Sequence, residues 1–157
     1  MNIFSRIINI NIYVLVFLVP LLFLPFSFEA FEFNKQYLLF FLVSLSFFSF
    51  LAKMALVDKE LRFKRTPLDL FVLGFLLVAI LSAVFSVDKT SSLFGFYGRF
   101  TGGLIGLLSL VILYFVVTNN IEVKRISSLL KTFIWSGFTT VLFTYLGIFG
   151  VLAKLAF

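Results

Sequence analysis

The residues best suited to chemistry lie in the link 86–104, between two strongly apolar runs. This link carries Asp88, Lys89, Tyr97 and Arg99. Arg99 offers a planar fork of hydrogen-bond donors that suits phosphate or pyrophosphate, and Lys89 adds a mobile second charge. Tyr97 has one polar and one apolar side, which suits the depth of lipid headgroups. These residue types predict that Arg99, Tyr97 and Lys89 bind a lipid-linked anion, although they also fit an arginine that snorkels to the interface beside an aromatic belt.

Two further groups of residues belong to the same predicted membrane surface. Gly98, Gly102 and Gly103 would let a ligand approach the backbone closely. Glu29 and Glu32 lie three residues apart among phenylalanines. That pattern is typical of an interfacial loop that dips its rings into the headgroups, and we do not interpret the two carboxylates as a catalytic pair.

The rest of the chain offers few groups for catalysis. It contains no Cys and no His, which excludes a thiol nucleophile, an imidazole base, a disulfide and any metal site built from those ligands. We therefore predict no catalytic residue, no metal site and no cofactor in this chain. The net charge of +6 needs no nucleic-acid partner, because its basic residues have a topological explanation and no nucleic-acid-binding module is visible.

Composition indicates the kind of molecule that positions the link. The chain has 157 residues, of which 62% are hydrophobic and 25 are Phe, with a mean hydropathy of +1.16. These values are typical of an integral membrane protein, and the apolar runs have the length of about 20 residues that a helix needs to cross a bilayer. We predict an all-α, polytopic transmembrane bundle of about five helices that forms one region, 1–157. The expected helices are 7–26, 37–56, 68–85, 103–118 and 129–149.

The first apolar run has two possible interpretations. It could be a cleaved signal peptide, but cleavage after Ala30 would place the bulky Phe28 where a small residue is required. We therefore expect a retained anchor. Pro20 and Pro25 lie in its second half, where we expect the helix to kink or end.

The distribution of basic residues predicts the orientation, because Lys and Arg are retained on the cytoplasmic side. One side of the five-helix scheme has nine of them: Arg6, Lys53, Lys59, Arg62, Lys64, Arg65, Lys124, Arg125 and Lys131. The other side has four: Lys35, Lys89, Arg99 and Lys154. The N-terminus is therefore expected to be cytoplasmic, and the link 86–104 is expected to face outward.

Several local patterns predict where a helix begins and which helix faces pack together. Thr66, Pro67 and Asp69 read as a helix start, with Thr66 as N-cap, Pro67 at the first helical position and Asp69 near the positive end of the helix dipole. Small residues recur on one face of each of the last two expected helices, where they favour close helix contacts and could receive partner transmembrane helices. They are Gly102, Gly106 and Ser109, then Ser136, Thr140, Thr144 and Gly147. No charge falls in the middle of an expected span, which disfavours a transporter or channel.

The segment 66–121 resembles the N-terminal half of the bacterial O-antigen ligase and O-antigen polymerase family. The likeness lies in a Pro-initiated helix, a Ser-x-Asp turn at 86–88 and the aromatic and glycine pattern FGFYGRF at 94–100, which leads into the next helix. The preceding segment 18–40 resembles the first hairpin of that family.

This resemblance implies a multi-pass, metal-independent glycosyltransferase of the bacterial inner membrane. Such an enzyme would act at the outer face on glycan linked to undecaprenyl pyrophosphate. Family members have many more helices and a large outward loop that supplies essential Arg and His residues, whereas this chain has no His. We therefore expect the chain to be the N-terminal membrane portion of such a protein and to be inactive alone. The alternative is a small non-enzymatic scaffold or subunit that binds partner helices.

Overall fold

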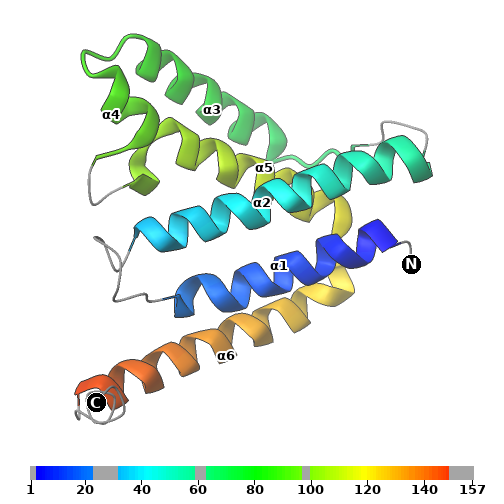
Figure 1. Ribbon diagram of the computed structural model, residues 1–157. Helices are drawn as coiled ribbons and strands as arrows, with labels where there is room; N and C mark the ends of the chain where they lie inside the picture. The colour runs from blue at the N-terminus through cyan, green and yellow to red at the C-terminus, as the bar shows by residue number, and fades with distance from the viewer. Residues whose placement is uncertain (1–2, 23–31, 59–62, 97–99, 149–157) are drawn as a thin grey trace.

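The structure, a computed structural model, describes residues 3–22, 32–58, 63–96 and 100–148. The described part consists of helices joined by short non-helical segments and contains no strand, which confirms the all-α class (Figure 1). Six α-helices occur in it, namely α1 (Ile3–Leu21), α2 (Phe33–Lys53), α3 (Asp69–Val84), α4 (Lys89–Phe94), α5 (Leu104–Asn120) and α6 (Val123–Ile148). A π-helical turn, η1 (Met54–Asp58), extends α2, and a 3₁₀ turn, η2 (Phe100–Gly102), precedes α5.

The five longer helices overlap the five expected ones, with informative differences at their ends. The helix α1 ends at Leu21, one residue after Pro20, as expected of a residue that disrupts a helix interior. The helix α6 begins at Val123, six residues earlier than predicted, because its first turns are helical but polar. The short helix α4 was not predicted at all.

Three described helical stretches are long and apolar enough to cross a membrane, and they support the prediction of a membrane protein. They are Ile3–Leu21, Phe33–Val57 and Val123–Leu146. The apolar helices α3 and α5 have only 16 and 17 residues. At about 1.5 Å per residue they rise by roughly 24–26 Å, slightly less than the hydrocarbon thickness of about 30 Å.

Packing centres on α1 and α2. The helix α1 lies between α2 and α6, while α2 also packs against α5, and α3 lies on the far side of α5 (Figure 1). Two apolar clusters fill these contacts. The first is formed by Ile8, Ile12, Phe50, Met54 and Val116, and the second by Leu15, Leu42 and Val43.

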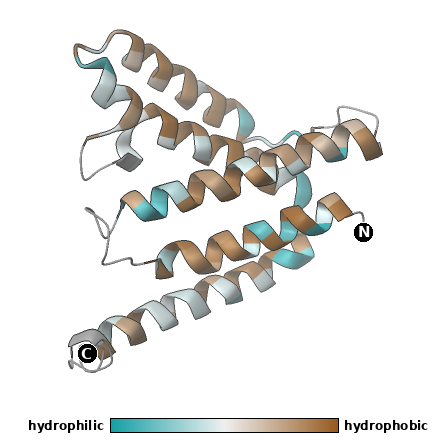
Figure 2. Ribbon diagram, in the orientation of Figure 1, coloured by the Kyte–Doolittle hydropathy of each residue, from teal (hydrophilic) through white to brown (hydrophobic). Residues whose placement is uncertain are grey.

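Successive long helices run in alternating directions, so the bundle has two distinct ends (Figure 1). The start of α1, the end of α2, the start of α3 and the α5–α6 connection meet at one end. We call this the basic end, because Arg6, Lys53, Lys64, Arg65 and Lys124 belong to those segments. The helix α4 lies at the other end, here called the link end. Figure 2 shows hydrophobic residues along the helices, with hydrophilic ones gathered largely toward their ends.

The small residues predicted at helix contacts are used largely within the chain. Gly106 and Ser109 are buried where α5 meets α2, and a Cβ atom on Gly106 would lie 3.2 Å from the Gln36 amide nitrogen. Ser136 of α6 is buried and donates a hydrogen bond of 2.7 Å to the Phe17 carbonyl of α1. Thr144 stays exposed. Gly106, Ser109 and Ser136 therefore lie buried within the chain, while the binding of partner helices to these two helix faces stays a prediction.

Candidate functional site

The predicted anion site lies in the link end, and the structure places only part of it. Lys89 is the first residue of α4 and is exposed. Tyr97 and Arg99 lie outside the described residues, as does Gly98. The described chain reaches Phe96 and resumes in η2, so the position of Lys89 relative to the other two candidates stays a prediction.

Asp88 fixes the start of α4 and thereby the position of Lys89. It has an extended backbone, and its Oδ1 accepts hydrogen bonds of 3.1 Å from the N–H groups of Thr90 and Ser91. The Ser91 hydroxyl donates to the other carboxylate oxygen. The hydrogen bond from the Ser91 side chain, followed by that from its backbone, lowers the pKa of Asp88. Asp88 is thus an N-cap, which fits its place in the Ser-x-Asp turn at 86–88.

Two glycines close the other side of α4. Gly95 ends the helix with a φ of 86°, a conformation that favours glycine. Gly103 lies so near that a Cβ atom on it would stand 2.5 Å from the Gly95 nitrogen and 2.6 Å from the Leu93 carbonyl oxygen. The close approach predicted at Gly103 is made in this structure by the chain's own backbone. Gly102 has open space around its missing side chain.

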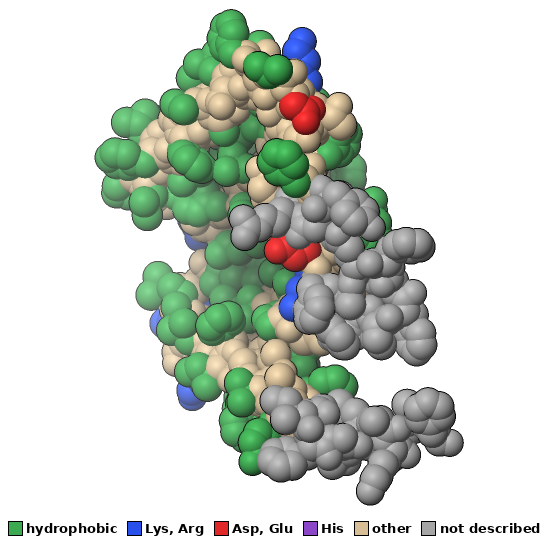
Figure 3. All heavy atoms as spheres, turned by 90° about the vertical axis from the view of Figure 1, so that its left-hand side faces the viewer, with side chains coloured by type: hydrophobic (Ala, Val, Ile, Leu, Met, Phe, Trp, Pro, Cys, Tyr) green, Lys and Arg blue, Asp and Glu red, His purple; other side chains and the backbone are tan. Residues whose placement is uncertain are grey.

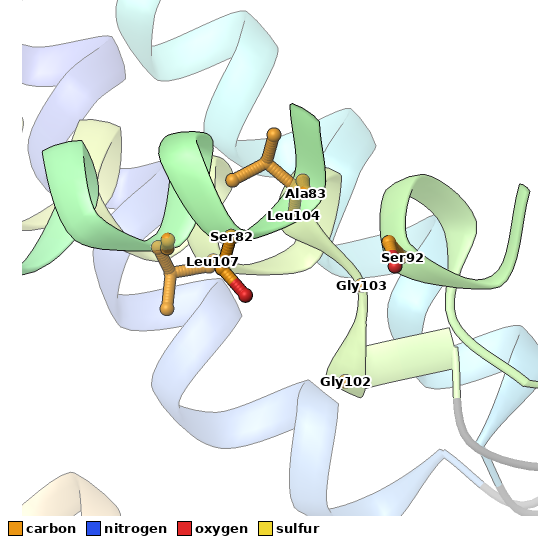
Figure 4. A pocket seen from close by; sticks show the side chains of 8 residues that line it. Ser82, Ala83, Ser92, Gly102, Gly103, Leu104 and Leu107 are labelled. Carbon is orange, nitrogen blue, oxygen red and sulfur yellow. The ribbon is translucent and has the colours of Figure 1, made fainter. Parts of the chain in front are cut away.

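A small cavity lies behind this turn, between α3, α4 and α5. Its volume is about 220 Å³, and its lining is made of small and aliphatic residues: Ala79, Ser82, Ala83, Ser92, Gly102, Gly103, Leu104 and Leu107. Figure 4 shows Ser92 of α4 and Ser82 of α3 on different sides of this cavity. Gly102 and Gly103 lie along the backbone that connects η2 to α5. None of the described residues in the cavity lining is charged, and Lys89 is not among them.

The link also contacts the start of α2. The Thr101 hydroxyl donates a long hydrogen bond of 3.4 Å to a carboxylate oxygen of Glu32, the residue that precedes α2. Glu29, the other glutamate of the predicted interfacial loop, lies outside the described residues. Figure 3 views this end of the molecule and shows mainly hydrophobic side chains with few charged groups among them.

A second polar cluster lies at the basic end. It joins Thr66 and Asp69, which the sequence pattern indicated as a helix start, to Tyr114, which no sequence pattern indicated. The hydroxyl of Tyr114, in α5, donates a 2.8 Å hydrogen bond to Asp69 Oδ1 and contacts the Thr66 hydroxyl. Thr66 itself donates to Asp69 through both its N–H, at 2.8 Å, and its hydroxyl, at 2.6 Å. The helix α3 begins at Asp69 with Leu68 at the N-cap, so the prediction of Thr66 as N-cap and Pro67 as first helical residue is wrong. Thr66 instead donates its N–H and its hydroxyl to the Asp69 carboxylate. Tyr114 gave no signal in the sequence, because its partners lie 45 and 48 residues away.

Neighbouring amides hold this cluster in place. Asn119 Oδ1 accepts a 2.7 Å hydrogen bond from the Lys64 N–H, and Asn120 Oδ1 accepts one of 3.0 Å from Lys53 Nζ. The segment before α3 is thereby attached to the end of α5.

No group of three or more potential metal-ligating residues occurs in the part of the chain that the structure describes. Comparison of the chain with protein-family models, curated proteins and solved structures finds no match.

Proposed function

We propose that this chain is the N-terminal membrane portion of an O-antigen ligase or O-antigen polymerase-like glycosyltransferase. Its site would lie at the outer face of the bacterial inner membrane, where it would bind glycan linked to undecaprenyl pyrophosphate. The proposal rests on the resemblance of segment 66–121 and on one structural observation. The segment that carries Tyr97 and Arg99 joins two firmly held pieces of backbone, the capped helix α4 and the turn η2.

The held backbone matters because a charged side chain binds a ligand best when its attachment points are ordered beforehand. Asp88 caps α4 on one side of the segment, and Gly103 packs directly on residues 93–95. Arg99 is two residues from Thr101, whose hydroxyl contacts Glu32. In this proposal Arg99 donates paired hydrogen bonds to the pyrophosphate, Lys89 adds charge, and Tyr97 packs at the headgroup boundary.

Substitution of Arg99 tests the proposal in the full-length protein, because the chain is expected to be inactive alone. Arg99→Ala should reduce glycan transfer while leaving the amount of protein in the membrane unchanged. A charge-assisted hydrogen bond contributes about 1.5–3 kcal/mol, which corresponds to a loss of roughly 10- to 150-fold in binding. Arg6→Ala is the matched control, since Arg6 belongs to the basic end. Transfer that is the same in Arg99→Ala and the unaltered chain would refute the assignment.

The alternative, a non-enzymatic scaffold or subunit, is favoured by a different observation. The helix α6 packs only against α1 among the described helices, and apolar side chains such as Phe133, Trp135 and Phe138 are exposed along it. Those side chains would face either lipid or another helix. A photo-crosslinking residue at position 138 shows whether α6 faces lipid or another protein. A protein adduct at position 138, together with glycan transfer that does not change in Arg99→Ala, would favour the scaffold.

A further inference from the structure

A cavity with charged residues in its lining lies at the basic end, away from the link. It has a volume of about 600 Å³ and opens between the segment before α3, α3 itself and α5. Its lining consists of Phe63, Lys64, Arg65, Thr66, Asp69, Leu70, Leu73 and Phe115. This volume is within the range of about 300–1,000 Å³ that small-ligand sites occupy.

The polar part of this cavity presents two cations, Lys64 and Arg65. Lys64 and Arg65 are exposed, and neither side chain forms a described ion pair or hydrogen bond. The third charged group, Asp69, accepts hydrogen bonds from Thr66 and from the Tyr114 hydroxyl, and it also interacts electrostatically, but more weakly, with Arg65. The excess charge in the lining is therefore positive, and the donors that remain available belong to Lys64 and Arg65.

The backbone that carries these cations is held from two sides. The Lys64 N–H donates to Asn119 of α5, and the Phe63 ring contacts the Phe50 ring of α2 edge-on, with 6.0 Å between the ring centroids. The cations are thus attached to ordered backbone at the mouth of the cavity. An ordered pair of cations binds an anion with a smaller entropy cost than two mobile ones.

The remaining lining is apolar and continues along α3. Leu70 and Leu73, one turn apart on α3, are 77% and 49% exposed, and Phe115 of α5 stands opposite them. A free phosphate would fill only the charged mouth and would leave these side chains uncovered. A ligand with a charged head and a hydrocarbon tail would contact both parts.

We propose that this cavity binds one anionic phospholipid, with its phosphate on Lys64 and Arg65 and an acyl chain along Leu70, Leu73 and Phe115. Basic pockets between membrane helices bind anionic headgroups in this manner, because attraction to the phosphate adds to burial of the chain. The geometry does not depend on the proposed glycosyltransferase function. It requires only that the basic end lie at the level of the headgroups.

Native mass spectrometry in a neutral detergent tests the proposal with phosphatidylglycerol and phosphatidylcholine as probes. The unaltered chain should retain one phosphatidylglycerol in preference to phosphatidylcholine. Lys64→Gln with Arg65→Gln should weaken that retention roughly 25-fold, since each cation near an anionic headgroup contributes about fivefold. The matched control, Arg6→Gln with Lys124→Gln, removes the same two residue types from the same end and should retain the lipid. Equal binding of both lipids, or equal loss in the control, would overturn the proposal.

A second measurement uses the unaltered chain and so does not depend on the folding of a variant. Phosphatidylglycerol with a photoreactive group in one acyl chain should form adducts mainly on residues 63–73 and on the peptide that contains Phe115. Adducts spread equally over the outer face of α6 would contradict a defined site. Glycerol phosphate is added as a competitor, and the lipid should remain bound. Displacement by comparable concentrations of glycerol phosphate would instead assign the cavity to a free anion.

Discussion

At the scale of single residues, Asp88 makes the link end sensitive to acid. Hydrogen bonds from Ser91 and Thr90 lower the pKa of Asp88 in the folded chain. The ionised carboxylate therefore stabilises α4 at pH values above 3.8, the ordinary pKa of an aspartate. That stabilisation is lost as the pH falls through the lower, folded pKa. We expect a nitroxide attached at position 90 to become more mobile below about pH 4. The measurement is the electron paramagnetic resonance line shape in bicelles.

The matched variant for this prediction is Asp88→Asn. Asparagine is also a good N-cap but does not titrate, so α4 should remain ordered at every pH in this variant. A mobility change below pH 4 that persists in Asp88→Asn would show that another group controls the link. The acid sensitivity is then unrelated to the cap.

Gly103 and Gly102 allow a second prediction, because they are adjacent but differ in surroundings. Gly103→Ala should destabilise the chain by about 1–3 kcal/mol, since its Cβ would overlap backbone atoms of Leu93, Phe94 and Gly95 that cannot move independently. Gly102→Ala should have almost no effect, because nothing lies within 4 Å of its Cβ position. Thermal unfolding in detergent measures both, and equal midpoints would disprove the tight contact.

The sequence revealed these residues unevenly. Asp88 stands directly before a Lys-Thr-Ser-Ser run and has the type of an N-cap, so the start of α4 carried a local signal. Gly103 was singled out for its lack of a side chain, but a sequence does not specify whether a ligand or the chain itself approaches it. The contact between Asp69 and Tyr114 joins two helices, and no local pattern predicts it.

At the scale of elements, α6 depends on a single neighbour. It packs on α1 alone among the described helices, and Ser136 is fully buried at that contact. Ser136→Leu should loosen α6 at a cost of about 1–3 kcal/mol, because a large side chain cannot fit and the hydrogen bond to Phe17 is lost. Spin labels at exposed positions 10 and 133 should then show a broader distance distribution.

The neighbouring residue supplies the control for α6. Gly137 has nothing within 4 Å of its Cβ position, so Gly137→Leu should leave the distance distribution unchanged. Broadening of similar size in both variants would mean that helix propensity, and not the α1 contact, determines the position of α6. A narrow distribution in Ser136→Leu would contradict the contact directly.

Long elements were more predictable than short ones for a physical reason. A segment that enters hydrocarbon must be apolar along its whole length, so the five runs were visible in composition alone. The polar first turns of α6, which contain Lys124 and Arg125, carry no such signal, and the helix was predicted to start too late. The six-residue helix α4 depends on its cap and on Gly103, and it has no hydrophobic pattern of its own.

At the scale of the whole molecule, the alternating directions of the helices bring basic residues from separate parts of the sequence to the same end. The segments that carry Arg6, Lys53, Lys64, Arg65 and Lys124 meet at one end, although they come from four different parts of the chain. We expect the short helices α3 and α5 to cross the bilayer as well, because local thinning of the bilayer and snorkelling of flanking residues compensate for a few ångströms of mismatch. The basic end is therefore expected to be cytoplasmic.

Single-cysteine labelling tests this orientation cleanly, because the chain contains no cysteine of its own. Thr90→Cys places a thiol in α4 at the link end, and Ser127→Cys places one near the start of α6 at the basic end; both positions are exposed. In intact cells a membrane-impermeant maleimide should label position 90, and it should label position 127 only after the membrane is opened. The reverse pattern would place the link inside and would remove the outer-face glycan site. Labelling of both positions in intact cells would show that α5 does not cross, because α5 is the long helix that lies between residues 90 and 127.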